Sequence, residues 1–121
     1  MSSGTVFTFP EQSELTEILG CEPIEARPED GYWCYQVSDG RGVSIRLSFD
    51  AFERSVQTVI SEGGREVAVV SQEGATEMAS LAAAQGGGIT CEFQWQGARS
   101  TMRLQVSPRL LLRWSTLRTE P

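Results

Sequence analysis

The sequence predicts an α+β fold, a mostly antiparallel meander sheet of about six strands with one or two helices packed on one face. Near the N-terminus, apolar residues recur at the spacing of a helix, whereas from residue 32 onward they largely alternate with polar residues. Clusters of Gly, Ser and Asp separate the alternating runs, and tight turns of this kind join antiparallel neighbours. The 121 residues are expected to form a single domain, 1–121, around one core.

The N-terminal helix is predicted over residues 10–19. Thr8 and Glu11 have the spacing of a capping box, and Gly20 is typical of the position at which a helix ends. Residues 21–31 are predicted to form a connection, with a short strand around 23–25 as an option. The apolar face of the helix is expected to comprise Leu15, Ile18 and Leu19.

A first β-hairpin is predicted from residues 32–37 and 43–49. The segment between them, 38–42, contains Ser, Asp and two Gly residues, which are typical of a tight turn. The returning strand alternates cleanly, so one face of this hairpin is expected to be buried. That face would carry Val43, Ile45, Leu47 and Phe49.

A second hairpin is predicted from residues 55–60 and 65–71, joined by a turn that contains two consecutive Gly residues. An alternative makes 52–61 a helix capped by Asp50. We favour the strand, because the β-branched residues of this segment disfavour a helix.

The C-terminal half is predicted to contain one helix and three strands. Residues 75–84 have the strongest helix propensity of the chain, although a strand is the alternative for so short a segment. The glycines at 86–88 are interpreted as a flexible connection, because a phosphate-binding loop would precede a helix rather than a strand. Alternation then predicts strands over 89–95 and 102–106, and a last strand over 110–114.

The composition excludes several kinds of catalytic chemistry. The chain has no His, and all ten of its basic residues are Arg, so a Ser-His-Asp triad, a His-ligated metal and a Lys Schiff base are excluded. Cys21, Cys34 and Cys91 lack the spacing of a zinc site or a disulfide framework and are expected to be inert thiols. No catalytic residue, metal site or cofactor is predicted, and we expect the chain not to be an enzyme.

The carboxylate pairs of the sequence are not expected to form a catalytic site. Carboxylate pairs such as Glu73 with Glu77, or Asp39 with Asp50, are interpreted as surface charge, because no apolar setting is evident that would raise the pKa of one carboxyl group.

Residues 1–5 lack the basic segment and long apolar run of a signal peptide, and the Cys content favours a reducing compartment. The expected location is therefore the cytoplasm.

The net charge of −6 is concentrated in one part of the chain. Residues 11–30 contain seven acids and one Arg, so this segment alone carries −6 and the remainder is neutral. A local negative field of this kind opposes binding to nucleic acid or to an acidic membrane surface, and both are excluded as partners. It favours a basic protein partner, because complementary potentials speed encounter. The alternative is a helix face that is merely solvated.

The candidate partner-binding residues follow from this charge distribution. Glutamates of the predicted helix and of the connection after it would supply the electrostatic attraction. One adjacent aromatic residue would supply an apolar anchor, because large aromatic side chains are enriched among the residues that dominate binding energy. The set comprises Glu11, Glu14, Glu17, Glu22, Glu25 and Trp33.

The Glu-rich stretch 11–30, together with a β-meander whose strands carry aromatic residues, resembles the small acidic immunity proteins of bacterial polymorphic-toxin and contact-dependent inhibition systems. The resemblance covers most of the chain, and no site residue is transferred from it. It implies a protein that binds a cognate toxin domain and blocks its active site.

Two other function classes remain open at this point. The chain could be a structural or assembly module that self-associates, or acts as an accessory subunit, through an unpaired sheet edge. It could also be a small ligand-binding protein or an enzyme based on carboxylates. The oligomeric state is not predicted by the sequence.

Overall fold

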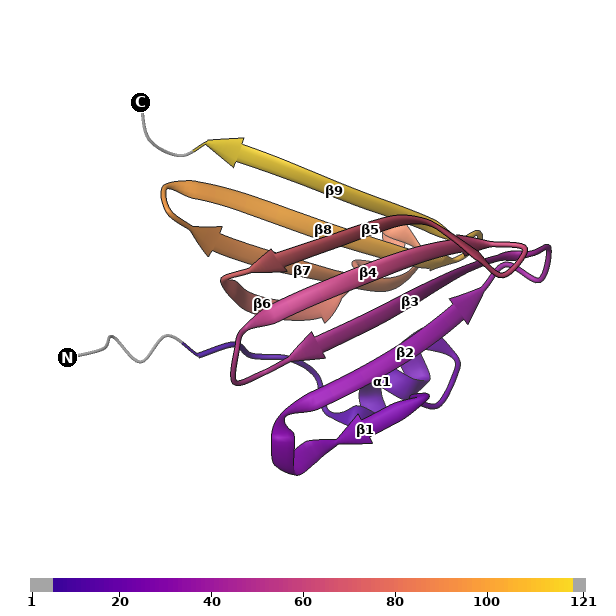
Figure 1. The fold of residues 1–121 in the computed structure, drawn as a ribbon, viewed down its shortest axis with the longest axis horizontal. Helices are drawn as coiled ribbons and strands as arrows, with labels where there is room; N and C mark the ends of the chain where they lie inside the picture. Colours follow the sequence, from indigo (N-terminus) through magenta and orange to yellow (C-terminus); the bar gives the residue numbers. More distant parts are fainter. Residues whose placement is uncertain (1–5, 119–121) are drawn as a thin grey trace.

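The computed structural model describes residues 6–118, which form two antiparallel sheets and one α-helix (Figure 1). Helix α1 spans Gln12–Leu19, and short 3-10 helices lie at Pro28–Asp30 and Ala83–Gln85. The first sheet has the order β1-β2-β3-β4-β5, and the second has the order β6-β7-β8-β9. The strands are β1 (Glu25–Arg27), β2 (Tyr32–Ser38), β3 (Val43–Asp50), β4 (Ser55–Glu62), β5 (Arg65–Glu73), β6 (Ala75–Ser80), β7 (Gly87–Trp95), β8 (Ala98–Ser107) and β9 (Leu111–Arg118).

The antiparallel meander is confirmed, but the prediction of one sheet of about six strands is wrong, because nine strands are divided between two sheets. The chain passes from one sheet to the other at Gly74, whose φ is +86°. A side chain there would press on the carbonyl of Gln94, and the Gln94 N–H donates to the Gly74 carbonyl at 2.9 Å. Alternation along a strand shows which residues face inward, but it carries no information about which sheet the strand joins.

The helix predicted over residues 75–84 is wrong: Ala75–Ser80 form β6, and a 3-10 turn follows. The pairing with β7 shifts register between Ala75 and Glu77, which leaves both Ala75 and Met78 buried. Buried residues three positions apart imitate the period of a helix. On its other edge β6 bonds to Thr8, which accepts from the Met78 N–H at 2.8 Å and donates to the Thr76 carbonyl at 3.1 Å. These tertiary hydrogen bonds outweigh the helix propensity of an Ala-rich segment.

The N-terminal helix is confirmed, but it begins at Gln12 and the predicted capping box does not form. A capping box would need Thr8 at the N-cap, but Thr8 is held against β6. Glu11 occupies the N-cap and makes no side-chain hydrogen bond there. The helix ends at Gly20 as predicted, with φ at +76° and its N–H bonded to the Thr16 carbonyl.

Both predicted hairpins are confirmed. The helix considered for residues 52–61 is absent: Asp50 accepts from the N–H groups of Phe52 and Glu53, and so caps a turn rather than a helix. The second hairpin turns at Gly63 and Gly64, which both have positive φ.

The short strand expected around 23–25 lies two residues later as β1, and the last strand extends beyond 114 to Arg118. The signal-peptide assessment of residues 1–5 lies outside the described residues.

The core lies between the two sheets and extends to α1, whose Leu15 and Leu19 are buried. The inner face of β3 is buried as predicted at Ile45, Leu47 and Phe49. Opposite the first sheet, the second contributes the buried side chains Ile89, Cys91, Phe93, Met102 and Leu104. The indole N–H of Trp114 in β9 donates to the buried Thr58 hydroxyl in β4 at 3.0 Å, so a polar contact also joins the sheets.

The glycines at 86–88 are not a free connection, which corrects the sequence-based interpretation. Gly87 and Gly88 belong to β7, and a Cβ at Gly88 would collide with the backbone carbonyl of Leu104 on β8. A Cβ at Gly86 would collide with the backbone carbonyl of Ser107 in the same way. The absence of side chains therefore permits β7 and β8 to lie close together at this end.

We expect Gly88→Ala to lower the free energy of unfolding, because the new Cβ meets backbone atoms that cannot move independently of β8. Backbone strain of this kind costs about 1–3 kcal/mol. The matched control is Gly40→Ala, which also has positive φ but has nothing within 4 Å of its Cβ position. Urea unfolding followed by fluorescence should rank Gly88→Ala as clearly the less stable variant, and equal midpoints would contradict this account.

Candidate functional site: the acidic face around α1

The outer side of α1 carries the first three predicted site residues together. Leu15 and Leu19 hold the opposite side of the helix against the core, and the glutamates of its outer side are left in solvent. Glu11, Glu14 and Glu17 are all exposed and line one shallow depression with Ser13 and Thr16. The structure thus brings together on one surface three carboxylates that the sequence places at intervals of three.

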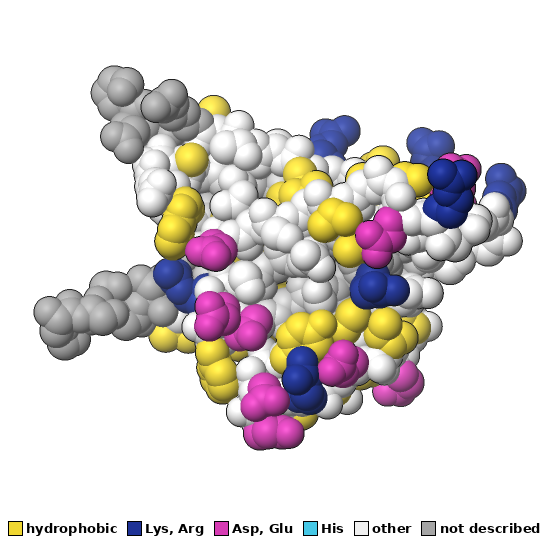
Figure 2. Space-filling view, viewed as in Figure 1, with side chains coloured by type: hydrophobic (Ala, Val, Ile, Leu, Met, Phe, Trp, Pro, Cys, Tyr) yellow, Lys and Arg dark blue, Asp and Glu magenta, His cyan; other side chains and the backbone are white. Residues whose placement is uncertain are grey.

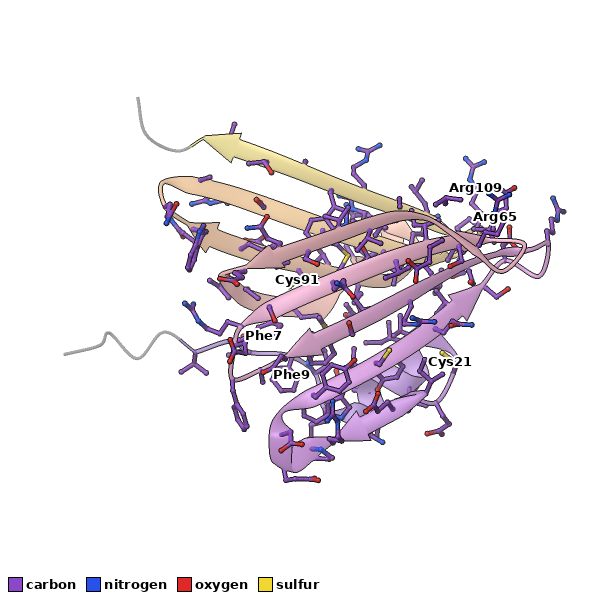
Figure 3. The ribbon with its side chains drawn as sticks, viewed as in Figure 1. Phe7, Phe9, Cys21, Arg65, Cys91 and Arg109 are labelled. Carbon is purple, nitrogen blue, oxygen red and sulfur yellow. The ribbon has the colours of Figure 1, made fainter. Side chains whose placement is uncertain are left out.

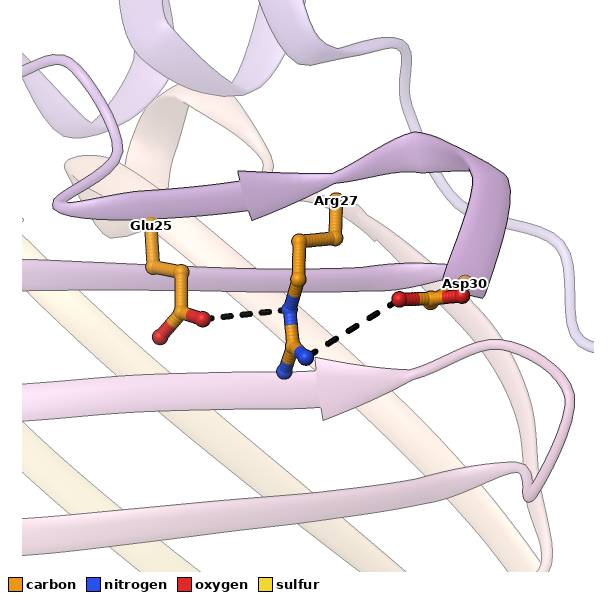
Figure 4. Close-up of polar contacts among 3 residues, drawn as sticks. All are labelled: Glu25, Arg27 and Asp30. Atoms are coloured by element: carbon orange, nitrogen blue, oxygen red, sulfur yellow. Dashed lines mark ion pairs between the residues drawn. The ribbon is translucent and has the colours of Figure 1, made fainter.

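The structure does not place Glu22 and Glu25 on one surface, because Glu25 points to the Tyr32 side of the first sheet and α1 packs on the Trp33 side. Glu22 is exposed in the connection after Gly20. Glu25 lies on β1 and forms an ion pair with Arg27, with 3.1 Å between Oε2 and Nε (Figure 4). Asp30 approaches the same guanidinium at 3.9 Å. Exposed pairs such as these contribute little stability, but they do neutralise part of the local charge.

Trp33 links β2 to the start of α1. Its indole N–H donates to the Gln12 side-chain carbonyl at 3.0 Å, and its ring stacks on Phe49 with 5.5 Å between centroids and 22° between planes. Phe9 covers it from another side at 5.3 Å. Trp33 is therefore half-buried, and only its exposed part is available to a partner. Tyr32, its neighbour, points to the opposite face of the sheet, where the Arg27 guanidinium lies 4.6 Å from its ring centroid.

The charges of the molecule are partly separated in space. In Figure 2, most acidic side chains of the visible face lie over its lower and left parts, with some Arg among them, whereas several Arg side chains lie at the upper right beside a few acidic ones. Residues 93–118 contain five Arg and no acid. Arg103 and Arg113 of this segment stand directly opposite each other on β8 and β9. A count of charges by segment would have revealed this basic part from the sequence.

The cysteines have the environments of buried apolar residues. Cys34 and Cys91 are buried, and Cys21 is half-buried with its thiol directed at the Gln36 carbonyl. Burial raises the pKa of Cys91 to about 12 and also raises the pKa values of Cys21 and Cys34. Because the thiolate is the nucleophile, these shifts oppose cysteine chemistry near neutral pH.

The remaining acids do not converge on a reaction centre. Asp39 and Asp50 lie at opposite ends of β3, where each accepts backbone N–H groups of its own turn. Within residues 6–118, no group of three or more Cys, Asp or Glu side chains is arranged to hold a metal ion. None of the helices described for this chain is both long and apolar enough to cross a membrane.

Comparison with known proteins gives one informative similarity. No family model matches the chain, and no curated protein matches its sequence. Among solved structures, the chain matches one from a contact-dependent growth inhibition toxin–immunity protein complex of Klebsiella pneumoniae 342, with a TM-score of 0.84. The match covers 93% of this chain and 99% of that one, at 18% sequence identity.

The two chains share one fold. The resemblance to proteins of contact-dependent inhibition systems that the sequence suggested is confirmed at the level of the fold, since the matched chain belongs to a toxin–immunity protein complex. At this identity the similarity concerns the backbone arrangement, and the functional surface has to be derived from the side chains of this chain.

We expect thiol reagents at about pH 8 to modify Cys21 first and to leave Cys34 and Cys91 protected, since a pKa of about 12 leaves only about one Cys91 thiol in ten thousand ionised. Mass spectrometry after brief exposure to iodoacetamide would measure this order. The Cys21→Ser variant should lose the fast reaction, and in concentrated guanidinium chloride all thiols should react. Rapid modification of Cys91 in the native protein would contradict its placement in the core.

Proposed function

We propose that the chain is a non-enzymatic protein-binding domain, an immunity-type inhibitor that neutralises a basic cognate toxin by occluding its active site. The observation that carries this proposal is the fold shared, over nearly the whole of both chains, with a chain of a toxin–immunity protein complex. The absence of His and Lys and the raised cysteine pKa values agree with a role that requires no catalysis.

The acidic face around α1 is the surface that we assign to the partner. Glu11, Glu14 and Glu17 face solvent on a helix that buried leucines fix to the core, so their charges are accessible to a partner. Glu22 adds a charge in the connection after the helix, and the exposed part of Trp33 would provide an apolar contact. Glu25, on the other face of the first sheet, would add negative charge at its β1 edge. Complementary charge accelerates encounter with a basic partner and discriminates against acidic proteins.

A second candidate function is self-association or an accessory role in an assembly. The observation that favours it is β5, an edge strand with exposed Val67, Val69 and Val70. Unpaired apolar edges are suited to strand addition. Sedimentation velocity over a wide concentration range tests self-association directly: a monomer throughout would remove it and leave only the accessory role.

The first experiment is to capture partners from lysate of the source organism at low and at moderate salt and to identify them by mass spectrometry. The inhibitor proposal expects one basic partner in stoichiometric amount, lost as salt rises. Addition of this chain should then abolish the partner's toxic activity. A captured partner whose activity is unchanged by saturating amounts of the chain would refute inhibition.

For the binding surface, we expect Glu14→Arg combined with Glu17→Arg to reduce the association rate with that partner by about tenfold or more at low salt. The cause is the reversal of two charges at the centre of the acidic face, a change of four units, and the effect should shrink as salt is added. Surface plasmon resonance would measure it.

The matched control for this pair is Glu62→Arg with Glu66→Arg, which makes the same change of charge at exposed positions of the β4–β5 hairpin. An equal loss in both variants would show that net charge, rather than the face around α1, governs association. An unchanged rate in the α1 variant would exclude the helix from the interface.

A further inference from the structure

A second concave site lies at the end of the molecule where the β2–β3 and β8–β9 turns meet. It is a cavity of about 450 Å³, within the size range of small-molecule sites. Both sheets contribute to its wall, and Figure 3 labels Arg109 and Arg65 at this end. The lining residues are Ser38, Asp39 and Arg41 from the first sheet and its turn, and Val106, Pro108, Arg109 and Leu110 from the second.

The two arginines of this cavity form no ion pair in the described part of the chain, although the charge of Arg41 acts on the nearby Asp39 carboxylate. Both are exposed, and among residues 6–118 the arginine ion pairs are those that Arg27 makes with Glu25 and Asp30. Asp39, the acid in the lining, already accepts from the N–H groups of Arg41 at 2.7 Å and Val43 at 3.1 Å. These backbone hydrogen bonds lower the pKa of Asp39, so its carboxylate stays ionised. The carboxylate is already hydrogen-bonded within its own turn. With two guanidinium groups and one carboxylate, the lining is net positive.

The surroundings add charges of both signs. The segment 93–118, which includes Arg109, contains five Arg and no acid, whereas the neighbouring β4–β5 turn contributes Arg65 together with Glu62 and Glu66. A concave surface with one sign of charge raises the local concentration of the opposite ion. In contrast to the acidic face around α1, the net positive lining of this cavity should attract anions.

The polar lining also includes a hydroxyl that is free to donate. The Ser38 Oγ accepts from the Gly40 N–H at 3.1 Å, which uses a lone pair and leaves the hydroxyl proton available. Guanidinium groups bind carboxylate and phosphate oxygens in a bidentate manner. Val106, Pro108 and Leu110 offer an apolar wall for the substituent that carries such a group.

We propose that this cavity is an oxyanion-binding site, in which Arg41 and Arg109 together hold a carboxylate or a phosphate group and Ser38 donates to it. Because the arginines come from turns of different sheets, a bound anion would connect the two sheets at this end. The site uses no residue of the acidic face around α1, so it stands or fails independently of the proposed inhibitor function.

The test is a titration of the full chain with inorganic phosphate, and separately with N-acetylglutamate, at constant ionic strength maintained with chloride, followed by amide NMR. We expect saturable shifts in both turns at once, around residues 39–42 and 107–111. Tighter binding of phosphate would identify a phosphate-bearing ligand, and tighter binding of N-acetylglutamate would identify a carboxylate, free or on a partner protein.

Arg41→Gln and Arg109→Gln should each weaken the apparent affinity by about fivefold to tenfold, since each removes a charge-assisted hydrogen-bonding group. Both residues are exposed in turns, so the NMR spectra should otherwise be retained. The matched control is Arg46→Gln, an exposed arginine on the outer face of β3 that does not line the cavity.

Three results would overturn the proposal: no saturation by either anion, shifts spread equally over every arginine-bearing segment, or equal weakening in Arg46→Gln. An arginine variant that lost its native spectrum would be replaced by Arg41→Lys or Arg109→Lys, which keep the charge but remove bidentate geometry. These should bind phosphate more weakly than the native chain, and unchanged affinity would contradict a guanidinium site.

Discussion

The contact between the inner faces of the two sheets holds every other part of this structure in place. Phe49 and its neighbours on β3 are buried in the core that both sheets share, and complete burial of such side chains contributes about 1.5–3 kcal/mol each. The hydrogen bond from Trp114 to Thr58 satisfies two polar groups at the same interface, which would otherwise oppose its closure. Helix α1 depends on this core as well: at eight residues it is too short to be stable alone, and Leu15 and Leu19 supply the packing that fixes it.

A rigid interior of this kind leaves the outer side of α1 and the turns free to carry function. The two surfaces that the structure presents have opposite charge. Glu11, Glu14 and Glu17 belong to a segment with net charge −6, whereas Arg109 belongs to a segment with five Arg and no acid. Because the surfaces share no residue, each can evolve and can be tested without the other.

The shared fold at 18% identity illustrates how loosely a backbone constrains a surface. Inward positions of the strands need only be apolar and of suitable volume, as Ile45 and Leu47 are here, and many sequences meet that condition. Exposed positions such as Glu14 carry no such requirement. Specificity for a partner therefore has to be established on the side chains of this chain, since a fold by itself does not determine what is bound.

The sequence by itself determined the local features: the helix that ends at Gly20, both central hairpins, the inward residues of β3, and the exposure of the glutamates on α1. These follow from periodicity, turn residues and charge, which act between neighbours in the chain. Tertiary structure alone decided the division into two sheets, the strand at Ala75–Ser80, the use of Thr8 to bond β6 and the partial burial of Trp33. It also brought Arg41 and Arg109, far apart in sequence, to one cavity. The physical reason is that each of these features depends on hydrogen bonds or packing between distant segments, and such contacts leave no regular pattern along the chain.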